Sequence, residues 1–328
     1  MTASKPEPTM EDICQAHDRI RPYIHRTPIM TCHSINEMAG CEIYFKCDHL
    51  QKVGAFKIRG ATNAVLSLPE EEARRGVVKH SSGNHAQALA LAAKWRGIPA
   101  YIVMPEDAPE VKKNAVMGYG GKITFCRPTV TDRETTAARV QSATGATFIH
   151  PYDNEEVIAG QGTAAKEFLE DQPDLDVILT PVGGGGLLAG TLLSAKAIKP
   201  TVKVFAMEPA RVDDAKRSIA AGRIMTNAST QTIADGLKTN LGEKTFPIIK
   251  RLVDEVITVP EEDILPALRV VLERMKQVIE PSSAVPVAPL LTGELKLPGQ
   301  KVGIHLCGGN VDLGAIDWTK IEPPRRVT

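Results

Sequence analysis

Short runs of apolar and β-branched residues alternate along the chain with longer segments whose apolar residues recur at helical spacing. Each apolar run stops at a turn or at glycine-rich residues, as buried strands do. The predicted strands are CEIYFKC (41–47), GVVKHSS (76–82), AYIVMP (100–105), KITFC (122–126), DVILTPV (176–182), KVFAMEP (203–209) and KVGIHLC (301–307). The predicted helices include residues 85–97, 132–144, 186–198 and 261–279. Alternation at this density predicts an α/β fold with mostly parallel sheets that helices cover on both faces.

The chain has 328 residues, enough for one large domain or two closely associated ones. Residues 76–150 contain enough strand–helix units for a small lobe, although no linker composition marks its edges. We therefore predict a small domain at 76–150 and a large domain formed by 1–75 and 151–328. We expect the polar N-terminal arm, up to about residue 12, to be loose.

Composition narrows the class of partner. Lys and Arg total 39, as do Asp and Glu, so net charge gives no reason to expect a nucleic-acid or membrane partner. Aromatic residues make up only 4%, which argues against a base-stacking surface. The apolar runs are far shorter than the roughly 20 residues that span a bilayer, and the polar N-terminus lacks a signal-peptide stretch. The six cysteines include no CxxC pair, so we expect reduced thiols in a cytoplasmic protein.

Three glycine-rich segments follow predicted strands, where ligands bind in α/β sheets. In TPVGGGGLLAG (180–190), four glycines leave backbone N–H groups unobstructed at the start of a predicted helix, which is typical of a phosphate cradle. The segment lacks the Lys-Ser/Thr pair of a P-loop and the GxGxxG spacing of a dinucleotide fold. It therefore favours a compact phosphate that is not part of a nucleotide, and the alternative is a flexible turn.

The segments HSSGNHA (80–86) and HLCGGNVDL (305–313) have the same position. The hydroxyls and amides of the first could bind a carboxylate, and Asn84 could donate to an oxyanion. The alternative is a helix N-cap, because Ser and Asn are common there. In the second segment, Cys307 could lie at the carboxyl end of a strand beside glycines that leave room for a flat ring. A buried cysteine is also often a packing residue.

Lys57 stands in GAFKIRGA (54–61), where neither a core strand nor a solvated face explains a lysine. An amine together with a phosphate cradle suggests pyridoxal phosphate held as a Schiff base. The motifs AFKIRGA, SSGNHAQ, VIAGQGT, PVGGGGLLAG, TIADG and CGGNVD occur in this order. From about residue 15 to 318 the chain thus resembles the fold-type-II pyridoxal-phosphate enzymes, in the family of threonine/serine dehydratases, serine racemases and 3-hydroxyaspartate dehydratases. The resemblance implies a tryptophan-synthase-β-like fold with two three-layer α/β/α lobes.

The resemblance also implies a role for individual residues of the cofactor site. Lys57 resembles the Schiff-base lysine, Phe56 the aromatic residue beside the cofactor ring, and Asn84 the donor to its phenolic oxygen. Cys307 resembles the residue opposite the pyridine nitrogen. The phosphate loop matches Gly183, Gly184, Gly185, Gly186 and Leu187, and the pocket lining matches Gly236 and Glu280.

The same resemblance implies a substrate and a metal site. The loop that receives the substrate carboxylate matches Ser81, Ser82, Gly83 and His85. Glu208 and Asp214, with the carbonyl of Val212, resemble the divalent-metal site of the racemase branch, and oxygen ligands suit Mg²⁺ or Ca²⁺. The alternative for this acidic pair is an ordinary polar loop.

The resemblance implies an amino-acid substrate and a homodimer. We predict an ammonia-lyase in which Lys57 removes the Cα proton of serine, threonine or 3-hydroxyaspartate before loss of the β-hydroxyl. The alternative is a serine racemase in which Ser82 reprotonates Cα from the opposite face. A thiol at Cys307 favours elimination, because it cannot keep the ring nitrogen protonated as a carboxylate would. Arg133 could contact a distal carboxylate of the substrate, or belong to a solvated helix face.

Overall fold

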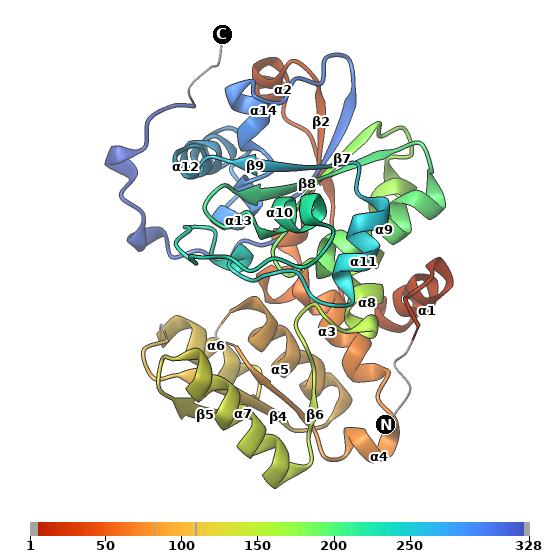
Figure 1. Ribbon diagram of the computed structural model, residues 1–328, viewed down its shortest axis with the longest axis vertical. Helices are drawn as coiled ribbons and strands as arrows, with labels where there is room; N and C mark the ends of the chain where they lie inside the picture. Colours follow the sequence, from red (N-terminus) through yellow and green to blue (C-terminus); the bar gives the residue numbers. More distant parts are fainter. Residues whose placement is uncertain (1–5, 82, 109, 325–328) are drawn as a thin grey trace.

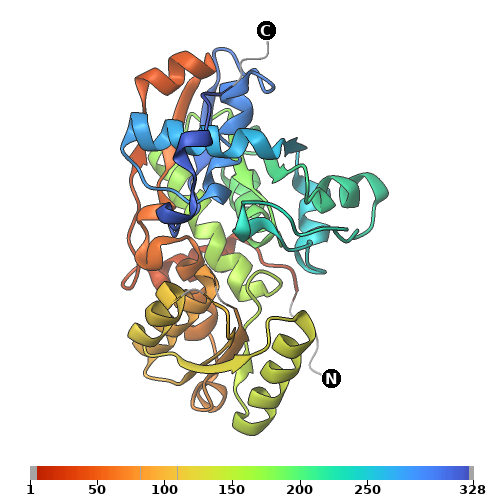
Figure 2. The same cartoon turned by 90° about the vertical axis from the view of Figure 1, so that its left-hand side faces the viewer.

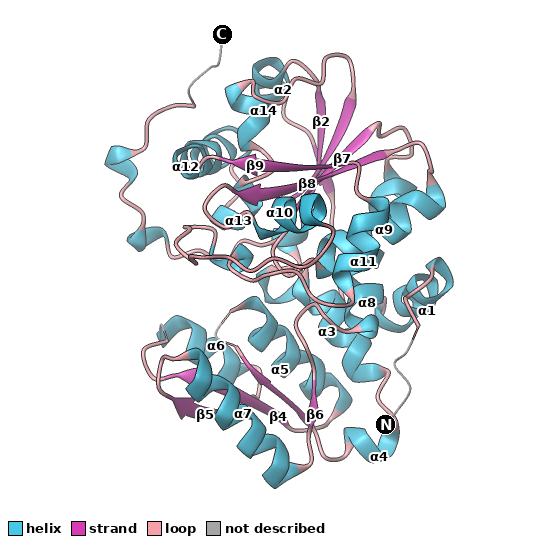
Figure 3. Ribbon diagram, viewed as in Figure 1, coloured by secondary structure: helices cyan, strands magenta, loops and turns pink. Residues whose placement is uncertain are grey.

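The computed structural model describes residues 6–81, 83–108 and 110–324, and its strands form two separate sheets (Figures 1 and 3). The strands are β1 (Ile29–Met30), β2 (Glu42–Lys46), β3 (Val77–His80), β4 (Ala100–Pro105), β5 (Lys122–Cys126), β6 (Thr147–Phe148), β7 (Val177–Pro181), β8 (Lys203–Pro209), β9 (Glu255–Val259) and β10 (Lys301–His305). One sheet has six strands in the order β1-β2-β10-β7-β8-β9, and the other has four in the order β5-β4-β3-β6. All neighbours are parallel except β1 and β2.

Helices connect the strands and cover the sheets. The longer ones are α1 (Met10–Ile20), α2 (His33–Ala39), α3 (Lys57–Leu66), α5 (Asn84–Arg96), α6 (Glu110–Gly118), α7 (Val130–Thr144), α8 (Glu155–Asp171), α9 (Gly186–Ile198), α10 (Asp214–Ala221), α11 (Thr245–Leu252) and α12 (Glu261–Val270). The shorter ones are α4 (Glu70–Ala73), α13 (Pro281–Ala284) and α14 (Ala288–Thr292), with helical turns η1 (Asp48–Leu50), η2 (Lys52–Gly54), η3 (Asp235–Leu237), η4 (Val271–Met275), η5 (Leu313–Ala315) and η6 (Trp318–Lys320).

The six-stranded sheet, with its helices, is the large lobe. Alternate residues of its strands pack on opposite faces, because successive side chains of a strand point to opposite sides. In β7, Val177 and Leu179 belong to the core under α2, α12 and α14, whereas Ile178 belongs to the core under α8, α9 and α11. The sheet is therefore the middle layer of three.

The four-stranded sheet, with its helices, is the small lobe. In β4, Ile102 and Met104 pack in the core that α5 covers, whereas Val103 packs with Ala137 of α7 on the other face. This lobe also has three layers, and the predicted α/β fold with mostly parallel sheets is confirmed. All four strands lie inside the range 76–150, and the division of the chain into two domains stays a prediction.

Helices α3 and α8 lie where the two lobes meet (Figures 1 and 2). Helix α3 contacts α5 of the small lobe and α8 of the large lobe. Its N-terminal residue is Lys57, so the junction of the lobes places this amine. None of the helices described here is long and apolar enough to cross a membrane.

Three local features differ from the sequence prediction. The N-terminal arm is not loose throughout, because α1 begins at Met10 and Thr9 closes a capping box with Asp12. The edge strands β1, β6 and β9 were not predicted, because β1 and β6 have only two residues each and EVITV of β9 is partly buried and lacks a continuous apolar run. The predicted helix 261–279 stops earlier, since Lys276 adopts a left-handed φ of 60° after the turn η4.

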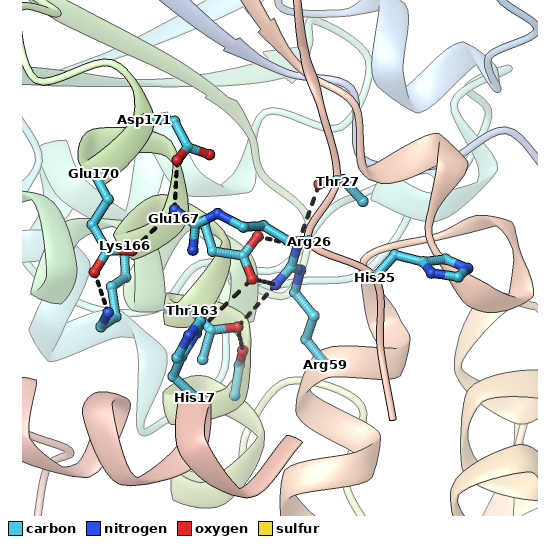
Figure 4. A network of polar contacts seen from close by, with 12 residues as sticks. His17, His25, Arg26, Thr27, Arg59, Thr163, Lys166, Glu167, Glu170 and Asp171 are labelled. Carbon is cyan, nitrogen blue, oxygen red and sulfur yellow. Dashed lines mark hydrogen bonds and ion pairs between the residues drawn. The ribbon is translucent and has the colours of Figure 1, made fainter. Parts of the chain in front are cut away.

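A network of buried charges holds the first turn of α3 against the large lobe (Figure 4). The guanidinium of Arg59 donates to Asp48 at 2.9 and 3.1 Å and to both oxygens of Glu167 at 2.9 Å. Lys46 Nζ donates to Glu167 at 2.8 Å, and the Thr27 hydroxyl donates to Asp48 at 2.6 Å. Burial acts to raise the pKa of Asp48, but the Arg59 guanidinium outweighs burial and lowers it. The carboxylates stay ionised because they face fixed cations.

Removing the Arg59 charge should destabilise the protein strongly. In Arg59→Met, two buried carboxylates lose their main partner, so the free energy of unfolding should fall by about 3–5 kcal/mol. The matched control is Arg26→Met, because Arg26 pairs with Glu170 and Asp171 but its side chain is 44% exposed. We expect the control to lose at most about 1 kcal/mol. Urea unfolding of both variants measures the difference, and equal losses would contradict this account of the network.

Candidate active site

One cavity of about 990 Å³ is lined by residues of both lobes. Its walls come from the start of α3, the β3–α5 loop, α7, the β6–α8 loop, the β7–α9 loop, η3 and the end of β10. Several of these segments follow the carboxyl ends of parallel strands, which is where α/β folds bind ligands. The described residues predicted for the cofactor and the substrate line this cavity: Phe56, Lys57, Ser81, Gly83, Asn84, His85, Gly183, Gly184, Gly185, Gly186, Leu187, Gly236, Glu280 and Cys307.

Backbone pairing places Lys57 beside the end of β10. Phe56 N–H donates to the carbonyl of Cys307 at 2.9 Å, and Gly309 N–H donates to the carbonyl of Gly54 at 2.9 Å. The side chains of Phe56 and Cys307 pack with Leu187 in a small apolar cluster. The amine of Lys57 therefore lies between the strand end that carries the thiol and the loop that carries the glycines.

The amine of Lys57 has few polar neighbours. Its Nζ donates to the carbonyl of Pro151 at 2.9 Å and lies 5.0 Å from the centre of the Phe56 ring. Desolvation lowers the pKa of Lys57 to about 8, and the charges of Cys307 and Glu280 act in the opposite direction. Burial also raises the pKa of the Cys307 thiol, so Glu280 is the neighbour that carries the charge. A pKa of about 8 leaves a fraction of the amine neutral near physiological pH, which is far more than for an ordinary lysine.

The tetraglycine loop presents unpaired backbone N–H groups. Within the described chain, none of the N–H groups from Gly183 to Leu187 donates to another group of the protein. Gly185 has φ +89°, which favours glycine, and a Cβ on Gly184 would lie 2.3 Å from the Tyr152 ring. Larger residues would therefore not fit this loop. Helix α9 starts here, so its dipole adds positive potential to the free N–H groups.

Asn84 is held in the cavity wall by partners from distant segments. Its Nδ2 donates to the two oxygens of Glu280 at 3.0 and 3.2 Å, and Asn310 Nδ2 donates to its Oδ1 at 2.9 Å. Burial raises the pKa of Glu280 to about 7, against the lowering effect of Asn84. Gly236 N–H donates to Ser282 Oγ at 3.1 Å, next to this carboxyl group.

The thiol of Cys307 is neutral and hydrogen bonded. Ser283 Oγ lies 3.3 Å from the sulfur and also donates to the carbonyl of Gly308 at 2.8 Å. Burial and the charge of Glu280 both raise the pKa of Cys307. The sulfur therefore supplies a weak hydrogen-bonding group rather than an anion.

The predicted carboxylate loop is the N-terminal end of α5. Ser81 Oγ accepts from Gly83 N–H at 3.3 Å, and His85 Nε2 lies 3.2 Å from the carbonyl of Ile149. Burial and the charges of Lys57 and Lys79 lower the pKa of His85 far below its usual range, so this imidazole is neutral. Ser82, predicted for catalysis and carboxylate binding, lies outside the described residues.

Several cavity residues were not predicted from the sequence. Lys79, Pro151, Tyr152 and Thr239 line the cavity, and Asn310 fixes Asn84. Only Lys79 had a local signal, as a lysine in the apolar strand that leads into the Ser-Ser-Gly-Asn turn. Arg133 also lines the cavity, so its helix does not present it to a purely solvated face.

The predicted metal residues form a separate, buried acidic pair. The two oxygens of Glu208 accept from the N–H groups of Ala215 and Lys216 at 3.0 and 2.8 Å, where α10 begins. Asp214 accepts from Leu241 N–H at 2.9 Å. Burial raises the pKa of Glu208 to about 8 and that of Asp214 to about 6. Within the described residues no group of three His, Cys, Asp or Glu side chains surrounds a metal position.

The residues of the cavity fit pyridoxal phosphate. The free N–H groups of the glycine loop suit a phosphate, and the desolvated amine of Lys57 suits an aldehyde. The cavity lies at the upper end of the volumes that hold small-molecule ligands, so a cofactor and a small substrate can share it.

Comparison with known proteins supports this fit. Residues 20–308 match the family described as pyridoxal-phosphate dependent enzymes. The chain is 53% identical over 312 residues to serine racemase of Dictyostelium discoideum, covering 94% of this chain and 96% of that protein. It is 47% identical over 311 residues to the beta-hydroxyaspartate dehydratase of Paracoccus denitrificans, covering 95% and 99%. The solved structure of maize serine racemase matches with a TM-score of 0.92 at 47% identity, covering 94% of this chain and 95% of that one.

These similarities extend over nearly the whole length of this chain and of each relative, so they concern the entire fold and not a single motif. They confirm the predicted fold type and pyridoxal phosphate as the cofactor. The chain belongs to the family of fold-type-II pyridoxal-phosphate dependent enzymes.

Proposed function

We propose that this enzyme is an ammonia-lyase that converts a small β-hydroxy amino acid (serine, threonine or 3-hydroxyaspartate) to a 2-oxo acid and ammonia. One observation carries the proposal: the desolvated amine of Lys57 shares a cavity with the unpaired N–H groups of the tetraglycine loop. The dehydratase of Paracoccus denitrificans, 47% identical, supports the elimination reaction.

Pyridoxal phosphate, when bound, supplies a ring that accepts electron density from the Cα atom of the substrate amino acid. Lys57 provides the basic nitrogen, and its Nζ takes the proton from Cα as a general base. Its pKa near 8 suits this step, because a base works best when its pKa lies near the operating pH. The β-hydroxyl group then leaves with a proton as water and gives an enamine. The enamine tautomerises to an imine, which one water hydrolyses to a 2-oxo acid and ammonia.

The remaining residues bind and orient. The N–H groups of Gly183 to Leu187 would hold the phosphate at the start of α9. Ser81, Gly83 and the neutral His85, with Ser82 in the same loop, would receive the substrate carboxylate at the start of α5. Asn84 would donate to the phenolic oxygen, with its orientation set by Asn310 and Glu280. Phe56 and Gly236 would flank the ring.

Cys307 bears on the choice of reaction. Its thiol would lie beside the ring nitrogen of the cofactor, and a neutral sulfur would not keep that nitrogen protonated as a carboxylate would. An unprotonated ring is a weaker electron sink, so rapid loss of the hydroxyl is favoured over a long-lived carbanion. This supports elimination.

Serine racemisation is the second candidate function, because relatives named serine racemase reach 53% identity. In that case Ser82 would return a proton to Cα on the face opposite Lys57. Both reactions begin with the same proton transfer to Lys57, so one active site could perform both.

Three further proposals follow from the family resemblance. A Mg²⁺ or Ca²⁺ ion would bind to Glu208, Asp214 and the carbonyl of Val212, because both ions prefer oxygen ligands. The domain division would be 1–75 with 151–328, and 76–150. The enzyme would act as a cytoplasmic homodimer, and its six free cysteines support the reducing compartment.

The activity test measures 2-oxo acid release and substrate chirality together. The purified holoenzyme should release 2-oxo acid from at least one of serine, threonine and 3-hydroxyaspartate. Lys57→Ala should lower this rate by at least about 10³-fold, because the base is lost. No 2-oxo acid from any of the three substrates would contradict the lyase proposal. Formation of D-serine from L-serine in the same sample would support the racemase alternative, and its absence would remove it.

The basicity of Lys57 gives a pH prediction. In the cofactor-free protein, acylation of Lys57 by a small anhydride should rise with pH through about 8, because the lowered pKa frees the neutral amine there. Glu280→Gln removes a charge that raises the pKa of Lys57, so the midpoint of the acylation profile should move to lower pH in this variant. Mass spectrometry of the Lys57 peptide gives the profile, with Nα-acetyl-lysine as internal standard. A midpoint equal to that of the standard would contradict the desolvated amine.

The metal proposal predicts stabilisation by a divalent ion. Mg²⁺ or Ca²⁺ at about 100-fold above its Kd should stabilise the folded protein by about 2.7 kcal/mol. Glu208→Gln should abolish this gain. Asp213→Asn is the matched control, since Asp213 lies next to the pair but forms an ion pair with Arg217 at 2.7 Å. Thermal unfolding after chelator treatment measures the effect, and a gain that survives Glu208→Gln would refute the site.

A further inference from the structure

Lys79 is a buried cation in the small-lobe wall of the active-site cavity. Lys79 lies on β3, two residues before Ser81, and is only 4% exposed. Its Nζ lies 4.3 Å from the centre of the Phe148 ring and 3.4 Å from His80 Nε2. Lys79, His80 and Phe148 all line the cavity.

No carboxylate within the described chain forms an ion pair with Lys79. Glu134 raises its pKa from a distance, but burial and then the charge of Lys57 lower it, to about 8. The amine is thus largely protonated at neutral pH although it is buried. Arg133 is a second cation in the same wall, and its Nε is buried without a hydrogen-bond partner in the described residues. Glu134 also lines this wall, but within the described residues it forms no ion pair with Lys79 or Arg133. Buried charges are normally paired, so these two cations leave room for a further anion.

The neighbouring histidines carry no charge and do not compete with the two cations for an anion. Burial, together with the charge of Lys79, lowers the pKa of His80 to about 4 and that of His150 to about 3. Both rings are neutral at physiological pH. The positive charge of this wall therefore belongs to Lys79 and Arg133.

The proposed reaction assigns the other charged groups of an amino-acid substrate elsewhere. In that proposal the loop at the start of α5 receives the α-carboxylate of the substrate. The tetraglycine loop is occupied by the phosphate of the cofactor. Serine and threonine have no further anion. A β-hydroxy amino acid with a side-chain carboxylate has one, and its charge is opposite to that of the two cations.

We propose that Lys79 determines specificity by binding the side-chain carboxylate of a dicarboxylic β-hydroxy amino acid, of which 3-hydroxyaspartate is the smallest. The inference rests on the proposed ammonia-lyase function. It orders the three candidate substrates, with 3-hydroxyaspartate preferred over serine and threonine. Arg133 assists through its unpaired guanidinium nitrogen.

The test compares two substrates in the holoenzyme and in Lys79→Met, which keeps most of the apolar stem but removes the charge. The ratio of kcat/KM for 3-hydroxyaspartate to that for serine should fall by about 10- to 100-fold, the usual effect of losing a hydrogen bond to a charged group. The matched control is Lys122→Met. Lys122 belongs to the same sheet and stacks on the Tyr101 ring at 5.5 Å, but it does not line the cavity, so its ratio should stay at the wild-type value.

Other outcomes overturn the inference. If Lys79→Met lowers kcat/KM equally for both substrates, Lys79 binds the α-carboxylate or acts structurally. If the ratio does not change, Lys79 does not select the substrate, although the lyase function stands. If the wild-type enzyme prefers serine, the proposed order of substrates is wrong.

A second measurement does not need turnover. Succinate should bind the holoenzyme more tightly than butyrate, because only succinate carries a second carboxylate, and Lys79→Met should abolish the difference. Calorimetric titration gives both constants. A preference for succinate that persists in Lys79→Met refutes the role of Lys79, even if no substrate yields a 2-oxo acid. An unfolding curve equal to the wild type shows that the variant is folded.

Discussion

The geometry of the active site depends on the ion network around Arg59. This side chain lies two residues after Lys57 on the first turn of α3, and buried carboxylates from η1 and α8 hold it in place. An isolated buried charge is unstable, so each member of the network requires the others. The direction of α3 is therefore set by electrostatics as well as by apolar packing. Because Lys57 starts this helix, the same network sets where the amine enters the cavity.

The cavity has a consistent electrostatic character. Lys57 and Lys79 are both desolvated, and each disfavours the protonation of nearby groups. Burial, and after it the charge of one or both lysines, lowers the pKa values of the wall histidines, which are therefore neutral. The free N–H groups of the glycine loop and the unpaired cation of Lys79 suit anions, in agreement with the phosphorylated cofactor and the acidic amino acid that we propose. The thiol at Cys307 is neutral as well, and its side chain packs with Phe56 and Leu187 in an apolar cluster.

Much of the fold could be predicted from local pattern. Strands such as KVFAMEP and DVILTPV have apolar side chains on both faces of the sheet, so they form continuous apolar runs that the sequence shows directly. The edge strand β9 was not readable, because one side is exposed and its apolar run is broken. The end of α12 was also missed, since the left-handed turn at Lys276 occurs at a residue that does not favour it.

The sequence alone determined the elements whose cause is local: alternating strands and helices, the four glycines before α9, and a lysine whose setting excluded both core and surface. Tertiary structure decided what these residues do together. Asn310 donates a hydrogen bond to Asn84, and Arg59 donates to Glu167. Both partners are distant in the sequence, so no spacing reveals these contacts. The pKa of Lys57 and the unpaired charge of Lys79 also arose only on folding, because desolvation depends on the whole surrounding protein and not on neighbours in sequence.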